Sequence, residues 1–348
     1  MGHTAGGVLS APYRRLVPSV QTARLFGPNA GVDSPLTDDS PRRSRHLPRV
    51  SAQTPVSDTS AETVAQPTRT GKSFTGGAHK DRHMRPIDDT PLTRDGKMLI
   101  LAYDHGLEHG PVDFEDVPES ADPARVFDVA THPAVTSLAV QKGIAEAYYP
   151  SYEDDVSLMA KLNGTSNLWM GEYDSAVNCS VDYAVDIGAE AIGFTLYNGS
   201  NHEVEMAEEF REAQEQAREH DLPVVMWAYP RGQGVKNDTK PGVIAYGARQ
   251  ALELGADVVK VKNPGSKAAM EHTVEMAGRT KVIMSGGSKR SDREFLQSVK
   301  TAMDAGTVGL AVGRNVFQRE QPERILDALE QLIFEEASVE DALAATER

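Results

Sequence analysis

The chain has 348 residues, a formal net charge of −15 and a single cysteine, Cys179. One cysteine excludes an intrachain disulfide framework and any cysteine-rich metal cluster, so nothing indicates an oxidising compartment, and we expect a cytoplasmic protein. Each apolar run ends within about ten residues at a charge, Gly or Pro, short of the roughly 20 that a membrane helix needs, so we expect no membrane association.

Residues 1–83 differ from the remainder in charge. They hold 11 Lys and Arg against 6 Asp and Glu, a net +5, whereas the rest holds 25 against 45, a net −20. Because nucleic-acid affinity rests mainly on cationic side chains that neutralise phosphates, we expect the acidic part to bind no DNA or RNA. Two explanations fit the acidic excess about equally well: a protein from a salt-rich cytoplasm, or an ordinary acidic enzyme.

The first 83 residues combine Ser, Thr, Pro, Gly and Arg with few large apolar residues and no sustained period. Such a composition cannot bury enough surface to offset the entropy of ordering, which predicts a disordered tail. Its Arg- and Ser-rich character also fits an organellar transit peptide, and Pro-Arg-Arg-Ser-Arg at 41–45 fits a targeting or nucleic-acid patch. We favour an upstream extension with Met84 as the functional start, because ordered-looking sequence begins directly after it.

From Pro86 onward, short apolar runs alternate with amphipathic segments, which is typical of an α/β protein. Helical patterns at 203–220, 243–255, 291–306 and 323–335 separate apolar runs, which requires parallel pairing of strands through crossovers. Eight such units predict a closed (β/α)8 TIM barrel over residues 84–340. The predicted strands, of which the third is the weakest, are 98–103, 137–141, 160–168, 191–197, 224–229, 258–262, 282–284 and 308–312.

Polar or glycine-rich clusters follow six of the predicted strands. In a barrel the carboxyl ends of the strands meet at one face, where active sites are built, so residues about 200 positions apart are expected to converge. The clusters begin at Asp104, Gln141, Tyr229, Lys260, Ser285 and Gly313.

Two lysines, Lys260 and Lys262, lie within an apolar predicted strand, and alternation puts both on one face. Burial and a neighbouring like charge both lower the pKa of an ammonium group, and a neutral lysine is the nucleophile that forms imines with carbonyl substrates. The alternative is that both stems reach a solvated rim. Spacing alone does not choose between the two lysines.

The preceding strand ends in Trp227-Ala-Tyr229-Pro-Arg231, and alternation places these three side chains on the side that faces the lysines. Tyr229 is expected to donate and accept protons near the imine carbon skeleton, with Trp227 as a flat wall. The alternative is ordinary core packing of aromatic residues at a strand end.

Small residues follow the last two predicted strands, as Ser285-Gly286-Gly287 and Gly313-Arg314. Barrel phosphate sites commonly use these two loops, where small residues expose backbone N–H groups and an arginine adds a bidentate partner. The pair of motifs predicts a phosphorylated substrate.

The run Asp104-His105-Gly-Leu-Glu108-His109-Gly110 also resembles a metal site, with two histidines four residues apart. Its glycines argue against a helix that presents both imidazoles together, and no further histidine cluster follows the later strands. We therefore interpret Asp104 as an acid/base group close to the amine, and expect no metal or other cofactor.

Together, several motifs resemble the archaeal-type class I fructose-1,6-bisphosphate aldolases over about residues 96–335. They are the segments 101–111, 141–145, 161–164, 178–180, 227–232, 260–262, 284–287 and 312–315. The resemblance implies that Lys260 forms the imine, that Tyr229 transfers protons, and that Asp104 assists the carbinolamine chemistry. It also implies that Trp227 and His109 lie in the substrate pocket, that Ser285, Gly286, Gly287, Gly313 and Arg314 bind phosphate, and that the chain forms a homo-oligomer.

The implied reaction is reversible cleavage of fructose 1,6-bisphosphate into dihydroxyacetone phosphate and glyceraldehyde 3-phosphate. Two alternatives stay open. A related group makes an amino-dideoxy-heptulosonate by transaldolase-like chemistry with a similar Lys, Tyr and Asp, although Trp227, the Glu108-His109 pair and the second lysine favour the aldolase. The other alternative is a phosphosugar-binding barrel without catalysis, for which ligand-dependent stabilisation without turnover would be expected.

Overall fold

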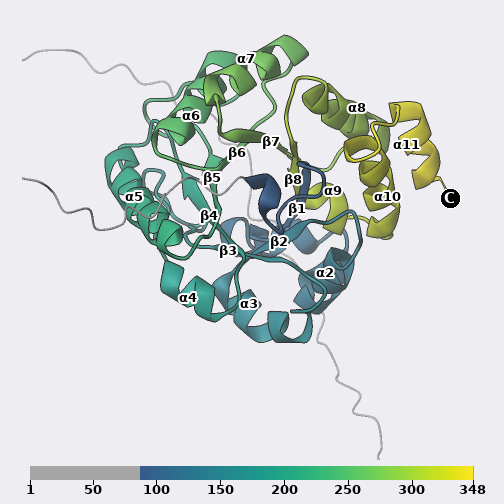
Figure 1. Cartoon of the computed structure of the whole chain (residues 1–348), viewed down its shortest axis with the longest axis horizontal. Helices are drawn as coiled ribbons and strands as arrows, with labels where there is room; N and C mark the ends of the chain where they lie inside the picture. The colour runs from purple at the N-terminus through teal and green to yellow at the C-terminus, as the bar shows by residue number, and fades with distance from the viewer. Residues whose placement is uncertain (1–86, 348) are drawn as a thin grey trace, which may run out of the picture. The chain divides into compact units, whose positions relative to one another are not determined.

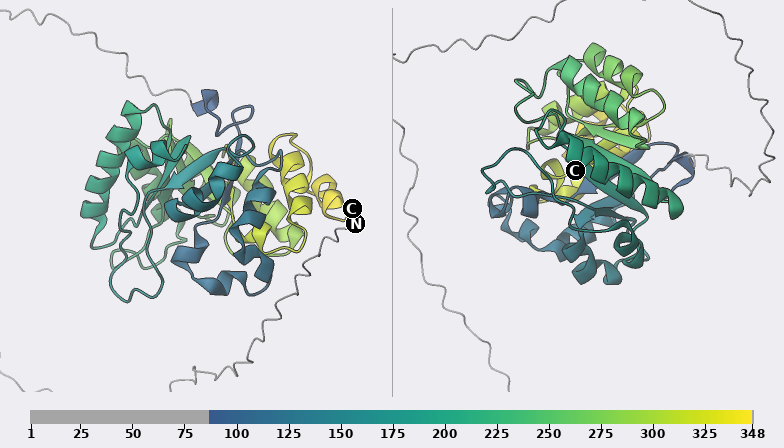
Figure 2. Two further views of the ribbon diagram at one scale, coloured as in Figure 1. Left: turned by 90° about the horizontal axis from the view of Figure 1, so that it is seen from below. Right: turned by 90° about the vertical axis from the view of Figure 1, so that its left-hand side faces the viewer.

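The computed structural model describes residues 87–347, so the expectations for residues 1–83 lie outside the described part of the chain. Within it, eight parallel strands form a closed barrel in the order β1 to β8, with β8 pairing back to β1. The helices surround the strands (Figures 1 and 2). The predicted (β/α)8 barrel is therefore confirmed.

The strands are β1 Met98–Ala102, β2 Ser137–Gln141, β3 Leu158–Lys161, β4 Ala191–Leu196, β5 Val224–Ala228, β6 Val258–Val261, β7 Lys281–Ser285 and β8 Gly309–Val312. The helices are α1 His105–Glu108, α2 Pro123–Ala130, α3 Lys142–Tyr148, α4 Val181–Asp186, α5 Glu203–Glu219, α6 Pro241–Glu253, α7 Lys267–Ala277, α8 Asp292–Met303, α9 Arg314–Phe317, α10 Pro322–Ile333 and α11 Val339–Thr346. Short 3-10 helices are η1 Ile87–Asp89, η2 Pro111–Phe114, η3 Pro118–Ala121 and η4 Tyr149–Ser151.

Nearly every strand residue is buried, because one face of the barrel wall meets the interior and the other meets the helices. On β1, Met98 and Ile100 point to the interior, while Leu99 and Leu101 pack in the layer under the helices. Strands covered on both faces read as continuous apolar runs. For this reason, seven of the eight strands were predicted to within one residue at each end.

The third predicted strand, 160–168, was wrong. The strand spans Leu158–Lys161, and beyond it Asn163 turns its side chain back to bond the backbone of β4, donating to the Thr195 carbonyl at 2.8 Å. The following Gly-Thr-Ser-Asn segment has turn chemistry, and Leu168 is 89% exposed. The apolar residues after Asn163 belong to a surface loop.

Helix boundaries follow local rules. Prolines begin α6 and α10, where a missing N–H costs nothing, and the Ser266 hydroxyl caps α7 by accepting from the Ala269 amide at 3.2 Å. Gly255 follows α6 with a φ of +86°, which an L side chain rarely adopts. No helix among residues 87–347 is long and apolar enough to cross a bilayer.

Residues 87–97 close the amino-terminal end of the barrel. Ile87 and Leu92 are buried against Met98 and Val258, the first residues of β1 and β6. In Figure 1 this segment, in dark blue, lies over the centre of the strand ring. The candidate site described next therefore lies at the opposite, carboxyl-terminal end.

Candidate active site

A cavity of about 330 Å³ opens at the carboxyl ends of the strands. It brings together the strand-end residues predicted from the sequence, with the exception of Trp227. The predicted residues that line it are Asp104, His109, Tyr229, Arg231, Lys260, Lys262, Ser285, Gly286, Gly287, Gly313 and Arg314. Thr239, Ser288 and Arg290 also line it and were not singled out in the sequence, whereas His105 and Glu108, which line it as well, were considered there only in the metal interpretation and in the resemblance.

Lys260 lies on β6, directly beside Trp227 of β5, and only 5% of its surface is exposed. Its amine is 4.8 Å from the centroid of the Trp227 ring and 5.8 Å from that of Tyr229. Burial lowers the pKa of Lys260 from 10.5 to about 8, against the opposing attraction of the Asp104 and Glu108 carboxylates. The neutral, nucleophilic amine is therefore accessible close to physiological pH.

The second lysine of the predicted pair does not act as expected. The amine of Lys262 is paired with Asp238 of the β5–α6 loop, so its charge is engaged at the rim of the cavity. Its pKa is lowered by burial. The lysine whose positive charge helps to lower the pKa of Lys260 is instead Lys161, at the end of β3. The expected like charge beside Lys260 is therefore not that of Lys262, because the Asp238 carboxylate holds the Lys262 amine at the rim.

Lys161 is the main residue that the sequence argument missed. It is fully buried, and its amine donates to the Thr195 hydroxyl at 2.7 Å and the Asn163 carbonyl at 2.9 Å. The amine lies 5.3 Å from the centroid of the Trp227 ring. Burial lowers its pKa. The sequence offered one signal for this residue, a lysine at the end of an apolar run. The predicted third strand began two residues too late, so Lys161 was not recognised as a strand-end residue.

Trp227 lies beneath the cavity rather than in its wall, because its side chain is only 1% exposed and packs in the barrel interior. A glycine on the neighbouring strand makes room for it: a Cβ atom at Gly193 would come within 2.5 Å of the indole. The indole therefore forms an aromatic floor under the amines of Lys161 and Lys260.

Tyr229 follows β5 and faces Lys260 across the cavity. Burial, and then the charges of Asp104 and Glu108, raise the pKa of Tyr229 well above its usual value, so its phenol is neutral at physiological pH. The Arg231 guanidinium lies 5.6 Å from the ring centroid of Tyr229, and at the same distance from those of Tyr173 and Tyr197. It opposes the rise in the pKa of Tyr229.

The β1–α1 junction supplies two carboxyl groups. Asp104 is buried, which opposes its ionisation, but the charges of Lys260, His105 and Lys161 outweigh burial and lower its pKa. Glu108 behaves oppositely: burial and the neighbouring Asp104 raise its pKa. One carboxyl group is thus stabilised as the anion and the other as the acid.

The two histidines that resembled a metal site are held by other contacts. Contrary to expectation, the segment forms a helical turn in spite of its glycine, and the two imidazole centroids lie 5.4 Å apart. His109 Nδ1 bonds Asp113 at 2.5 Å, and His105 packs edge-on against Phe317 at 5.1 Å. Burial lowers the pKa of His105 to about 4. Among residues 87–347, no three His, Cys, Asp or Glu side chains are arranged to hold a metal ion.

The loops after β7 and β8 form one wall of the cavity. Gly287 has a φ of +70°, which favours glycine. A Cβ atom at Gly313 would lie 2.3 Å from the His105 ring, so no side chain fits there. Gly287 is exposed and Gly313 is packed against His105, and both line the cavity beside the Arg314 side chain.

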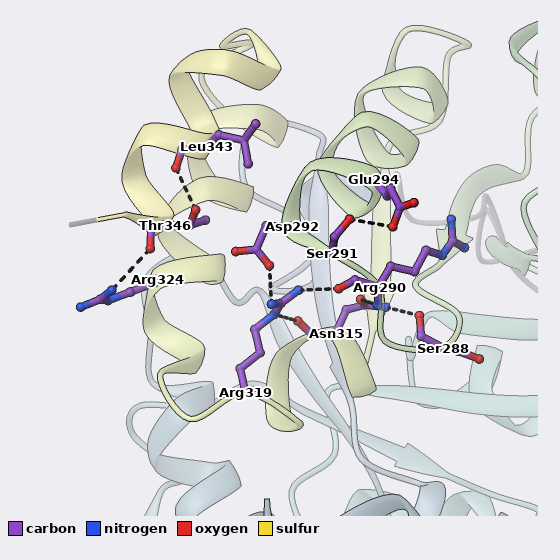
Figure 3. A network of polar contacts seen from close by, with 10 residues as sticks. All are labelled: Ser288, Arg290, Ser291, Asp292, Glu294, Asn315, Arg319, Arg324, Leu343 and Thr346. Carbon is purple, nitrogen blue, oxygen red and sulfur yellow. Dashed lines mark hydrogen bonds and ion pairs between the residues drawn. The ribbon is translucent and has the colours of Figure 1, made fainter. Parts of the chain in front are cut away.

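Asn315 fixes this wall and was not predicted as a site residue. It is fully buried, and its side-chain amide donates to the Gly286 carbonyl at 3.0 Å and the Ser288 carbonyl at 2.9 Å. Its side-chain oxygen accepts from the Arg290 amide at 3.0 Å. Arg319 holds the same loop from the other side, through the Asn315 carbonyl and Asp292 (Figure 3). The β7–α8 loop is thus held by several hydrogen bonds where it meets the cavity.

Comparison with known proteins places this site in context. Residues 98–319 match the DeoC/LacD family of aldolases. A relative from Halobacterium salinarum named fructose-bisphosphate aldolase class 1 is 73% identical over 260 residues, which are 75% of this chain and 99% of the relative. Another Halobacterium salinarum protein, named 2-amino-3,7-dideoxy-D-threo-hept-6-ulosonate synthase, is 31% identical over 254 residues, or 73% of this chain and 92% of the relative.

A solved structure is also similar. It is of an archaeal fructose-1,6-bisphosphate aldolase with its catalytic lysine covalently bound to the carbinolamine intermediate of the substrate. The TM-score is 0.66 at 46% identity, over 68% of this chain and 94% of that one.

Proposed function

The chain belongs to the DeoC/LacD family of aldolases and is a class I fructose-bisphosphate aldolase, and we propose that Lys260 is the amine that forms the Schiff base with the substrate. The observation that carries the proposal is a buried amine at the end of β6, with its pKa lowered to about 8, that lines the cavity beside Asp104 and Tyr229. Lys262 is a weaker candidate, because its amine is paired with Asp238.

In the cleavage direction, the neutral amine of Lys260 attacks the C2 ketone of fructose 1,6-bisphosphate, and the carbinolamine loses water to give an iminium ion. Tyr229 then takes the proton of the C4 hydroxyl as the C3–C4 bond breaks and glyceraldehyde 3-phosphate leaves. The iminium nitrogen accepts the electron pair of the broken bond. The resulting enamine is reprotonated and hydrolysed to dihydroxyacetone phosphate, and the reverse sequence is aldol addition.

The electrostatics of Tyr229 restrict how it moves this proton. A phenol whose pKa is raised by burial is almost never ionised at physiological pH, so a free phenolate is not available to take this proton. As a neutral group it accepts the C4 proton while it passes its own proton to a carboxylate. Asp104 exerts the largest carboxylate effect on the pKa of Tyr229, and we assign it as the acceptor. Asp104 also takes the proton released when the Lys260 amine attacks and passes it to the C2 oxygen, which becomes the carbinolamine hydroxyl, so Asp104 is an anion again when the C3–C4 bond breaks.

We assign one substrate phosphate to the wall formed by the β7–α8 loop and the start of α9. Ser285, Gly286, Gly287 and Gly313 line this wall, where the Ser285 hydroxyl and backbone N–H groups are the donors we propose, and the Arg314 guanidinium adds a positive charge. The Gly286 amide itself is already bonded to the Ala311 carbonyl at 2.9 Å. Arg231, Lys262 and His109 line the remaining rim, and we propose that they contact the rest of the sugar phosphate. Trp227 supports the reacting carbons indirectly, as the aromatic floor beneath Lys260.

The test is borohydride trapping with fructose 1,6-bisphosphate in excess EDTA, followed by peptide mass mapping. A reduced adduct on Lys260 is expected, because an iminium ion is reduced in place. An adduct on Lys262 would keep the chemistry and overturn the assignment. If no adduct formed and EDTA abolished activity, the metal interpretation of His105 and His109 would replace the imine mechanism.

The identity to the heptulosonate synthase is 31%, against 73% to the fructose-bisphosphate aldolase, so the comparison favours the aldolase over this alternative. A substrate panel separates the two, because only an aldolase splits fructose 1,6-bisphosphate into two triose phosphates. A phosphosugar-binding barrel without catalysis would show ligand-dependent stabilisation but no borohydride adduct.

We also propose that residues 84–340 form the catalytic domain, that residues 1–83 are an extension dispensable for catalysis, and that the enzyme is a homo-oligomer. The relative from Halobacterium salinarum supports the first two proposals, because it is matched over 99% of its length by 260 residues of this chain. Activity of a chain that starts at Met84 tests the extension, and light scattering measures the oligomeric state.

A further inference from the structure

A second cavity, with a volume of about 510 Å³, lies between the β6–α7 loop and α8. Every residue that lines it is polar or a glycine, so it suits a polar ligand and not an apolar side chain. It shares Asn263 and Arg290 with the active-site cavity, and the two cavities therefore adjoin. The aldol reaction proposed above uses neither residue.

One wall of the second cavity carries a hydroxyl donor without a strong acceptor. The Asn263 side-chain amide donates to the Ser298 hydroxyl at 2.7 Å, and the Ser298 proton reaches only the Met284 sulfur, at 3.8 Å. Sulfur is a weak acceptor, so a ligand oxygen in the cavity would form a better bond with Ser298. Gln297, the preceding residue of α8, is exposed and forms no side-chain hydrogen bond within residues 87–347. Such amides and hydroxyls match the hydroxyl groups of a sugar, which both donate and accept.

The lining also holds one cation and one anion. Within residues 87–347, the Arg290 guanidinium forms no hydrogen bond or ion pair, although the Arg290 amide donates to the Asn315 side-chain oxygen at 3.0 Å. Glu294, in the first turn of α8, accepts from the Ser291 hydroxyl at 2.6 Å. Figure 3 shows the Arg290 side chain extended on the side of Glu294, away from Asn315. A guanidinium binds phosphate in a fork and a carboxylate accepts from sugar hydroxyls, so the lining matches a phosphorylated sugar.

Arg290 is within reach of both cavities. A Cβ atom at Gly287 would lie 3.3 Å from a guanidinium nitrogen of Arg290, so this guanidinium lies beside the wall to which one substrate phosphate is assigned. An anion in the second cavity would draw the same group to itself, and two anions would then compete for one cation. Arg290 is thus a physical link between the second cavity and substrate binding.

We propose that the second cavity binds a sugar monophosphate, and that the bound ligand weakens the binding of fructose 1,6-bisphosphate. The phosphate pairs with Arg290, and the sugar hydroxyls bond with Gln297, Ser298 and Glu294. The volume of about 510 Å³ lies within the range of small-molecule sites, roughly 300–1,000 Å³. The ligand forms no covalent bond and does not touch Lys260, so the KM should rise while kcat stays constant. The effect on the substrate rests on the aldolase reaction proposed above, whereas the site itself does not.

The test is calorimetric titration of the full-length enzyme with glucitol 6-phosphate, which carries a phosphate and hydroxyl groups but no carbonyl group that Lys260 could attack. Gln297→Glu adds a carboxylate to the lining at nearly constant size, and it should weaken binding about tenfold or more because like charges repel strongly at short range. Gln216→Glu makes the same change at an exposed position of α5 and is the matched control. Equal binding by all three proteins would overturn the inference, and so would binding of unphosphorylated glucitol with the same affinity.

A second titration separates the two cavities. Enzyme whose Lys260 has been reduced onto the substrate with borohydride has its active-site cavity filled. It should still bind glucitol 6-phosphate, but more weakly, because both anions use Arg290. Complete loss of binding would show that the probe enters only the active-site cavity, and would overturn the inference.

Steady-state kinetics test the link to the substrate. Glucitol 6-phosphate should raise the KM of the wild type for fructose 1,6-bisphosphate. Gln297→Glu should have unchanged kinetics without the probe and should need about tenfold more of it for the same effect; equal inhibition of both proteins would overturn the coupling. If the wild type forms no borohydride adduct, the proposed function fails, while the comparison of Gln297→Glu with Gln216→Glu in untreated enzyme still decides whether the site exists.

Discussion

Replacing Lys260 by methionine is expected to abolish aldol cleavage and, at the same time, to raise the free energy of unfolding. Methionine fills a similar volume without an amine. Burial lowers the pKa of Lys260 from 10.5 to about 8 in the folded protein, and each pKa unit corresponds to about 1.4 kcal/mol. Keeping this amine protonated therefore destabilises the folded state by about 3 kcal/mol. The attraction of Asp104 and Glu108 is already contained in that pKa.

The effect has a definite pH dependence. The unfolded chain holds the Lys260 proton more tightly than the folded protein does, so the cost is fully present below the folded pKa of about 8 and disappears above 10.5. The advantage of Lys260→Met should therefore be about 3 kcal/mol at pH 7, about 2 kcal/mol at pH 9 and close to zero near pH 11.

Urea unfolding of both proteins at equal concentration, at pH 7 and pH 9, measures these differences. Lys267→Met is the control, and it should give no such gain, because Lys267 lies exposed at the start of α7 and its ammonium group stays hydrated in the folded protein. The reasoning is refuted if Lys260→Met is less stable than the wild type at pH 7, or if its advantage does not shrink with rising pH.

Three further substitutions test the site. Tyr229→Phe should still form the borohydride adduct on Lys260 but cleave the substrate about 10²- to 10⁴-fold more slowly; equal loss of both steps would contradict the assigned role. Lys161→Met removes a positive charge that lowers the pKa of Lys260, so the pH at which adduct formation reaches half its maximum should move upward, and an unchanged profile would show that the two amines are uncoupled. Asn315→Ala removes the amide that holds the Gly286 and Ser288 carbonyls, so the KM for fructose 1,6-bisphosphate should rise about tenfold, with no such rise expected if the phosphate binds elsewhere.

Features that depend on a strand and the residues directly after it were predictable from the sequence. Lys260, Tyr229 and the glycines after β7 and β8 were found this way, because a barrel brings every strand end to one face. What the sequence could not show is which side chains meet across strands. Lys161 is buried by partners from β4 and β5, Thr195 and Trp227, and its role emerges only when the strands are in register.

Two errors have related physical causes. Lys262 was expected to sit against Lys260, but an acidic residue of the β5–α6 loop reaches it, and loop conformation is not encoded in strand periodicity. Likewise, the glycine in residues 104–109 lowers helix propensity without preventing one turn from forming. That turn brings Asp104 and Glu108 to one side. Because the segment was interpreted as a loop, the proximity of the two carboxyl groups could not be predicted.

Residues 87–97 cover the amino-terminal end of the barrel, and the cavity of the described domain opens at the carboxyl-terminal end. Substrate, both triose products and the water used in hydrolysis then share one passage, so a bulky molecule held at that mouth should block entry and exit together. The closed end suits engineering, because the chain enters there just ahead of β1. A reporter or a solid support joined directly at Ile87 would attach on the face away from the chemistry.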